Sequence, residues 1–139
     1  MEINIHQVPQ SLNIREEHLT SIITHVSEDL ALNAESLSFV FVDDTYLADL
    51  HNRYLDNPSK TDVITFNLGE DKIEGEIYIS HDRAFIQAGT YNVTFEEEIV
   101  RLMVHGVLHL AGYDDLREEE RQKMKLEESR LLDLYFNNR

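Results

Sequence analysis

Cysteine is absent from the 139 residues of this chain. Its absence excludes disulfide bonds, zinc sites built from thiolates and a cysteine nucleophile. A chain without disulfides also suits a reducing compartment, and we expect it in the cytoplasm. No apolar run approaches the roughly 18 residues that a membrane span requires. The N-terminus lacks the basic region and apolar stretch of a signal peptide, so no membrane partner is expected.

Basic residues are also scarce. The chain has 12 Lys and Arg against 27 Asp and Glu, which gives a formal net charge of −15 at pH 7. Non-specific binding of nucleic acid depends on Lys and Arg that displace counterions from phosphates, so this composition argues against it. An acidic surface instead favours solubility and a basic protein partner. Any contact with RNA must come from a local basic patch or from such a partner.

The spacing of apolar residues predicts secondary structure along the whole chain, and we expect one domain over residues 1–139. Strands are expected near residues 3–8, 38–42, 63–66 and 75–80, and helices near 15–32, 45–54, 81–91, 95–111 and 116–136. The inner face of the last helix is expected to hold Met124, Leu131, Leu134 and Tyr135. The fold class is therefore α+β, with a small mixed sheet of about four strands packed with helices. The second pair of strands, 63–66 and 75–80, can form a hairpin.

Two histidines stand four residues apart in a helix that is apolar on nearly every side, and they are His105 and His109. That spacing places both imidazoles on one face, where they can bind one metal ion. Gly112 ends the helix, because glycine readily takes the left-handed conformation of a C-cap, and Asp115 follows outside it. Two histidines and one carboxylate leave a position for water, which is typical of a catalytic zinc site. Asp114 is the alternative third ligand.

These residues also have structural interpretations. A helix that is apolar nearly all round is buried, and buried histidines can bond to backbone carbonyls instead of a metal. Asp115 can cap the last helix, with Glu118 three residues on to complete a capping box. Thr94 and Glu97 form a capping box before the helix that holds the two histidines, and we expect that helix to begin at Phe95. The metal interpretation is preferred because the His pair, the glycine and the carboxylate occur together.

Three segments resemble the YbeY family of bacterial metal-dependent endoribonucleases. One runs from His105-Gly106 through His109-Leu110 to Gly112-Tyr113-Asp114. Another, Thr61-Asp62-Val63-Ile64-Thr65-Phe66, is similar to the family's Thr-Asp-Val-Leu-Ser-Phe strand. A third, Gly75-Glu76-Ile77-Tyr78-Ile79-Ser80, is similar to its Gly-Asp-Ile-x-Ile-Ser strand. The resemblance covers essentially the whole chain and implies a compact fold related to the zincin metalloproteases.

The resemblance also implies a function. It implies a hydrolase that cleaves single-stranded RNA and matures the 3′ end of the 16S rRNA during ribosome biogenesis. One Zn²⁺ per chain would be held by His105, His109 and Asp115, and water on the metal would be the nucleophile. The ribose 2′-hydroxyl is an alternative nucleophile. The expected partners are the small-subunit rRNA and a basic ribosomal protein or assembly factor.

Two positions depart from the family pattern. The family's third ligand is usually a histidine directly after Tyr-Asp, where this chain has Asp115. A carboxylate there makes the site more negative and should weaken the metal as a Lewis acid. The family commonly has an arginine, implicated in ribonuclease activity, where this chain has Leu55. Arg53 and Lys60 are the nearest cations that can contact phosphate in its place.

Two other functions compete with the nuclease. A ribosome-assembly factor, whose metal holds the last helix to the core, would suit both the acidic charge and Leu55. A metallopeptidase is less favoured, because the zincin general base is the Glu of His-Glu-x-x-His and Gly106 occupies that position. Cleavage of naked RNA by the purified protein would separate the nuclease from the assembly factor.

Overall fold

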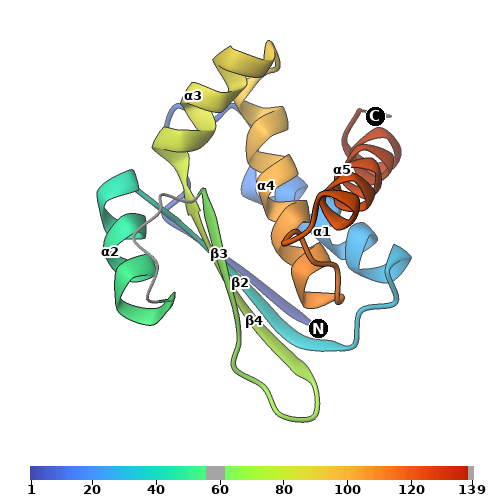
Figure 1. Cartoon of the computed structure of the whole chain (residues 1–139). Coiled ribbons are helices and arrows are strands. Elements are labelled where there is room, and N and C mark those ends of the chain that lie inside the picture. Colours follow the sequence, from blue (N-terminus) through green and yellow to red (C-terminus); the bar gives the residue numbers. More distant parts are fainter. Residues whose placement is uncertain (56–61, 138–139) are drawn as a thin grey trace.

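The computed structural model describes residues 1–55 and 62–137. The strands form one four-stranded sheet, and helices lie on both of its faces (Figure 1). The elements are β1 (Glu2–His6), α1 (Glu16–Asp29), β2 (Ala34–Val42), α2 (Asp44–Leu55), β3 (Val63–Asn67), β4 (Ile73–Ser80), α3 (His81–Tyr91), α4 (Phe95–Leu110), α5 (Glu118–Leu132) and a π-helical turn, η1 (Asp133–Asn137). The α+β prediction is confirmed, and the largest difference in a strand is that β2 begins four residues earlier than expected.

The sheet has the strand order β1-β2-β4-β3. β1 pairs in parallel with β2, and β2 in parallel with β4. β3 and β4 pair antiparallel and form the expected hairpin. The sheet is therefore mixed, and β3 lies at one of its edges.

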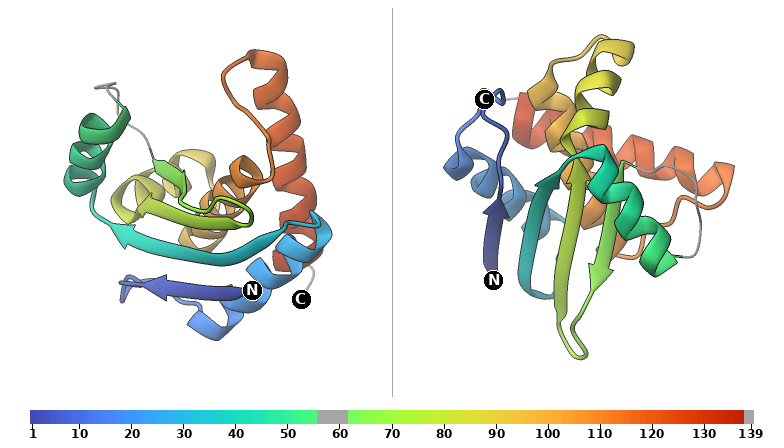
Figure 2. Two further views of the ribbon diagram at one scale, coloured as in Figure 1. Left: turned by 90° about the horizontal axis from the view of Figure 1, so that it is seen from below. Right: turned by 90° about the vertical axis from the view of Figure 1, so that its left-hand side faces the viewer.

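Helices cover the two faces of the sheet unequally. Seen from the left of Figure 1, α2 lies in front of the strands and α1, α4 and α5 lie behind them (Figure 2). The main hydrophobic core fills the space between the sheet and these three helices. A smaller core under α2 consists of Val42, Leu47 and Ile64. Within the described residues, no helix is long and apolar enough to span a membrane.

Helix α4 begins and ends as its sequence predicts. The side chain of Thr94 accepts a hydrogen bond from the backbone N–H of Glu97 at 3.0 Å, which confirms the N-cap. At the other end, Gly112 has a φ of +103°, and the N–H of Tyr113 donates to the carbonyl of Leu108 at 3.0 Å. That bond, with one from Gly112 N–H to the carbonyl of residue 109, is a Schellman motif. It turns the chain back so that the following loop lies beside the helix.

Gly106 allows α4 to lie close to β4. A Cβ atom at this position would lie only 2.7 Å from Cγ2 of Ile77. A larger side chain would therefore displace Ile77 or move the helix away from the sheet. Position 106 therefore faces the sheet, whereas His105 and His109 point away from it.

The prediction for the last helix is partly wrong. Its buried residues are Met124, Glu128, Leu131 and Leu132, and Leu134 is 45% exposed. The reason is that η1 has a wider turn than an α-helix, so the 3.6-residue spacing no longer holds beyond position 132.

Candidate metal centre

Three side chains from α4 and its following loop converge on one point. The Nε2 atoms of His105 and His109 lie 3.1 Å apart. Oδ2 of Asp115 lies 3.5 Å from Nε2 of His105 and 3.6 Å from Nε2 of His109. The ligands of a tetrahedral zinc ion, each at about 2.0–2.2 Å, are separated by about 3.3–3.6 Å. The spacing of these three atoms therefore fits a shared metal ion.

Asp114 is engaged elsewhere. Its Oδ1 accepts hydrogen bonds from the backbone N–H groups of Asp115 at 2.7 Å and Leu116 at 3.1 Å, which is an Asx turn. The N-cap of α5 is Arg117, without a side-chain capping bond. The interpretation of Asp115 as the helix cap is therefore wrong, and Asp115 is the carboxylate that faces the His pair.

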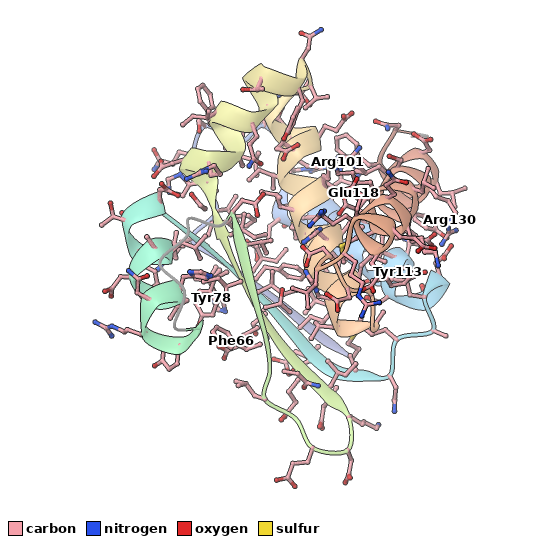
Figure 3. All side chains as sticks on the ribbon, viewed as in Figure 1. Phe66, Tyr78, Arg101, Tyr113, Glu118 and Arg130 are labelled. Carbon is pink, nitrogen blue, oxygen red and sulfur yellow. The ribbon has the colours of Figure 1, made fainter. Side chains whose placement is uncertain are left out.

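A buried carboxylate from α5 holds His105 from behind. Oε2 of Glu128 lies 2.6 Å from Nδ1 of His105. Its other oxygen, Oε1, accepts a hydrogen bond from Arg101 at 3.2 Å, and Arg101 extends from α4 toward α5 (Figure 3). Because the carboxylate accepts the Nδ1 proton, a neutral His105 presents an unprotonated Nε2 to the site. The fold thus selects the tautomer that binds a metal.

Sequence reasoning missed Glu128. It follows Met124 by four residues and precedes Leu131 by three, so it lies within the buried stripe of α5. A carboxylate in such a stripe is costly unless it finds partners. That mismatch is the signal by which it could have been found, although its partner His105 is 23 residues away in the sequence.

The surroundings act differently on the two histidines. Burial would lower the pKa of His105, but the hydrogen bond and the negative charge of Glu128 outweigh it, and the pKa is raised. Burial lowers the pKa of His109, and the neighbouring His105 lowers it further. Carboxylates on two sides therefore favour one positive charge between the imidazoles. A metal cation supplies that charge, so the donor set fits a metal in charge as well as in spacing.

Glu98 lies on α4 about two turns before His105. Its side chain is almost completely buried, and burial raises its pKa to about 7. Arg101, one turn along the helix, partly offsets this effect. Glu98 is therefore a carboxyl group that changes its charge close to neutral pH.

His105, His109 and Asp115 line a cleft with a volume of about 570 Å³. One wall is the end of α4 with its loop, and it consists of His105, His109, Leu110, Asp115 and Leu116. The opposite wall comes from β3 and α2, and it consists of His51, Asp62, Val63, Ile64, Thr65 and Asn67. The cleft therefore runs along the edge strand of the sheet and has the size of a small-ligand site.

Of the two cations expected to contact phosphate, the structure places only Arg53, and Arg53 is not in this cleft. Arg53 does not line it, and its side chain is 68% exposed and pairs with Asp49 at 3.2 Å. Lys60 lies outside the described residues. Across residues 1–55 and 62–137, the cleft walls contain no Lys or Arg. Arg121 stands beside the loop, where it donates to the backbone carbonyl of Asp115 at 3.4 Å.

Comparison with known proteins agrees with the motifs. A family model described as Endoribonuclease YbeY matches residues 3–135. Endoribonuclease YbeY of Flavobacterium psychrophilum is 41% identical over 127 residues, or 88% of this chain and 89% of the relative. Endoribonuclease YbeY of Christiangramia forsetii is 33% identical over 135 residues, or 96% of this chain and 94% of the relative. The solution structure of TM1509 from Thermotoga maritima matches with a TM-score of 0.63 and 25% identity, over 98% of this chain and 93% of that chain. The chain belongs to the YbeY endoribonuclease family.

Proposed function

We propose that this chain is a metal-dependent endoribonuclease that acts in the maturation of ribosomal RNA. The observation that carries the proposal is the convergence of His105, His109 and Asp115 at the head of a cleft. The family to which the chain belongs supports the reaction class. The small-subunit rRNA, near its 3′ end and in single-stranded form, is the substrate that we expect.

The metal would be held by His105, His109 and Asp115, and Zn²⁺ suits their two imidazole nitrogens and one carboxylate oxygen. When bound, it supplies Lewis acidity toward a phosphoryl oxygen and activates a water for attack. The role of Glu128 is to orient His105 and to keep its proton on Nδ1. Asp115 closes the ligand set from the loop, which the Schellman motif at Gly112 directs back to the helix.

The acidic composition supports dependence on a partner. The net charge is −15, and the described part of the cleft wall has no Lys or Arg. Free RNA therefore gains little from electrostatic attraction to this site. We expect slow cleavage of naked RNA and faster cleavage when a basic ribosomal protein or assembly factor presents the RNA.

The peptidase alternative has less support. The residue at the place of the zincin general base is Gly106, and a side chain there would run into Ile77 of β4. A glutamate could not occupy this position unless Ile77 or the helix moved. Zinc-loaded protein should therefore leave unstructured protein substrates intact.

A cleavage assay distinguishes the nuclease function from that of a non-catalytic assembly factor. A time course would use labelled RNA that spans the 3′ end of the small-subunit rRNA, naked and within small subunits. The parent should cut both forms, the second faster, and a His105→Ala variant should cut neither. If His105→Ala cuts as well as the parent, the cleavage comes from a contaminant and the assembly-factor function replaces the nuclease.

A further inference from the structure

Large apolar side chains are exposed on the outer side of α3. Phe85 is 65% exposed and Ile86 is 64% exposed. Gly89 follows one helical turn later, and a Cβ atom at this position would meet no other atom within 4 Å. Spacings of three and four residues place the three positions on one side of the helix, away from the buried Ala84 and Ala88. The outer side of α3 is therefore an apolar stripe that the described part of the chain leaves largely exposed.

The stripe borders a hollow between α3 and the start of α4. The ring centroids of Phe85 and Phe95 lie 5.5 Å apart, and the two rings pack edge to face. Together with Ile86 they line a hollow of about 320 Å³, and its other lining residues are Ser11, His81 and Asp82. An exposed apolar patch with a polar rim marks an interaction site. Aromatic and apolar side chains of a protein partner commonly fill such hollows.

The rim of the hollow is acidic. Asp82 lines it with a side chain that is 48% exposed, and Glu96 stands in the first turn of α4. Among the described residues, no Lys or Arg lines the hollow, and the guanidinium of Arg83 is paired with Asp44 at 3.4 Å. Arg and Lys side chains bind carboxylates and also lie favourably over aromatic rings. The rim therefore complements a basic protein segment and disfavours the phosphates of RNA.

We propose that a basic segment of a small-subunit ribosomal protein docks on the α3 surface, which consists of Asp82, Phe85, Ile86, Phe95 and Glu96. An apolar side chain of the partner would fill the hollow beside the two phenylalanine rings, and its Arg or Lys side chains would pair with the two carboxylates. The identity of the partner rests on the proposed function. The expected substrate is small-subunit rRNA, so a protein that presents it is carried on the same particle.

The α3 surface is separate from the metal centre. The hollow and the cleft share no lining residue. Phe95 and His105 are ten residues apart on α4, which is about 15 Å along the helix axis. In Figure 1, α3 and the beginning of α4 lie at the top of the molecule, and the end of α4 lies below them. A partner on the α3 surface therefore leaves the cleft open to RNA.

Affinity for purified small ribosomal subunits, measured by co-sedimentation, tests the apolar part of the surface. Phe85→Ser should weaken binding at least about tenfold, because aromatic anchors carry much of the binding energy of an interface. The side chain is largely exposed, so the variant should fold. Leu126→Ser is the matched control, since it removes an apolar side chain that is 73% exposed on α5. The control should bind as the parent does.

The acidic rim is tested by the double variant Asp82→Asn, Glu96→Gln. Both amides keep an oxygen for the backbone hydrogen bonds that the carboxylates accept, so the fold should be retained. Affinity for small subunits should fall about 5- to 20-fold at low salt, and the difference should shrink as the salt concentration rises. Glu17→Gln with Glu119→Gln makes the same change in net charge at exposed positions and should change the affinity less than about twofold.

Cleavage of naked RNA is the control for the cleft, and every variant should cleave it at the parental rate. The inference is overturned by a parent that does not bind small subunits, or by a folded Phe85→Ser protein that binds them as tightly as the parent. An equal loss of subunit binding and naked-RNA cleavage in Phe85→Ser would overturn it too, because that result indicates general damage.

Two further measurements exclude other occupants of the α3 surface. Protein-free small-subunit rRNA that binds as tightly as intact subunits would show that the contact is with RNA. A parent dimer that Phe85→Ser dissociates, detected by analytical ultracentrifugation, would assign the surface to a second copy of this chain. Either result overturns the inference. A parent that binds small subunits through this surface but cleaves no RNA would instead refute the nuclease function and support the docking surface.

Discussion

The two walls of the cleft differ in how their polar atoms are satisfied. On the α4 wall, His105 is bonded to Glu128, and Glu128 to Arg101. On the β3–α2 wall, His51 and Thr65 each have a buried polar atom without a partner. A hydrogen-bonded network fixes the side chains that take part in it, whereas the two unpartnered atoms have no such restraint. The α4 wall is therefore the more firmly fixed of the two, which suits the metal site proposed there.

The apolar packing behind the α4 wall is also more extensive than the packing behind the β3–α2 wall. Helix α4 lies in the main core, between the sheet and α5. Helix α2 lies over a small core, and beside it Phe66 and Tyr78 pack edge to face at 6.0 Å (Figure 3). The ligand wall is thus held by more buried apolar surface than the opposite wall. Substitutions that break the ligand wall should have the larger effects.

The largest effect is expected at the loop carboxylate. Asp115→Asn should lower zinc affinity more than about 100-fold, because an amide lacks the charge that completes a two-histidine, one-carboxylate site. Asp114→Asn is the matched control, since Asn retains the oxygen that accepts the Asx-turn bonds. Competition with a chelator of known affinity measures both. If zinc affinity fell only in Asp114→Asn, the ligand would be Asp114 and not Asp115.

The next effect is expected at the carboxylate behind His105. Glu128→Gln keeps a hydrogen-bond acceptor but removes the charge, and zinc affinity should fall about 10- to 100-fold. Glu119→Gln makes the same change at an exposed position of α5 and should have no effect. Equal affinities for the two variants would mean that Glu128 contributes packing alone.

A smaller effect, on stability rather than metal binding, is expected at Glu98 of α4. Its folded-state pKa of about 7 lies above the ordinary value of 4.5, so the native state binds the proton more tightly. The resulting stabilisation is fully present below the ordinary value and is lost as the pH rises through 7. Glu98→Gln should therefore raise the free energy of unfolding by about 1–3 kcal/mol at pH 8 and by much less near pH 5. Urea unfolding at several pH values measures this, and a difference that does not change with pH would contradict the assignment.

The smallest effect is expected at the C-terminal end of α2. Position 55 is the last residue of α2, and Leu55→Arg restores the cation that the family commonly has there. A new phosphate contact should raise the rate on naked RNA about tenfold at most. Arg53→Ala tests the neighbouring cation in the same assay. If both rates equal that of the parent, cleavage does not depend on a cation at either position.

The sequence predicted those features that depend on neighbouring residues. The spacing of His105 and His109, the N-cap at Thr94 and the stop at Gly112 are signals within one helix and its ends, and the structure contains each of them. The direction of strand pairing depends on contacts between distant segments, so the sequence does not predict it beyond the hairpin. The error at Leu134 arose because a π-helical turn interrupts the α-helical spacing.

The missed parts of the site are contacts between distant elements. Glu128 meets His105 across 23 residues of sequence, and His51 reaches the cleft from a helix on the far face of the sheet. No local pattern links these residues to the His pair. In the sequence, Asp62 stands out only as part of a strand motif, but the fold places it in the cleft wall.

The central claim is that a metal held by the α4 wall is needed for RNA cleavage, and a metal titration of activity tests it most directly. Chelator-stripped protein, verified by elemental analysis, would be given increasing zinc while the cleavage rate of a single-stranded RNA is followed. The account predicts no cleavage without metal, a rise with added zinc and a break at one ion per chain. Full cleavage by the stripped protein, or a rate that does not respond to zinc, would contradict it.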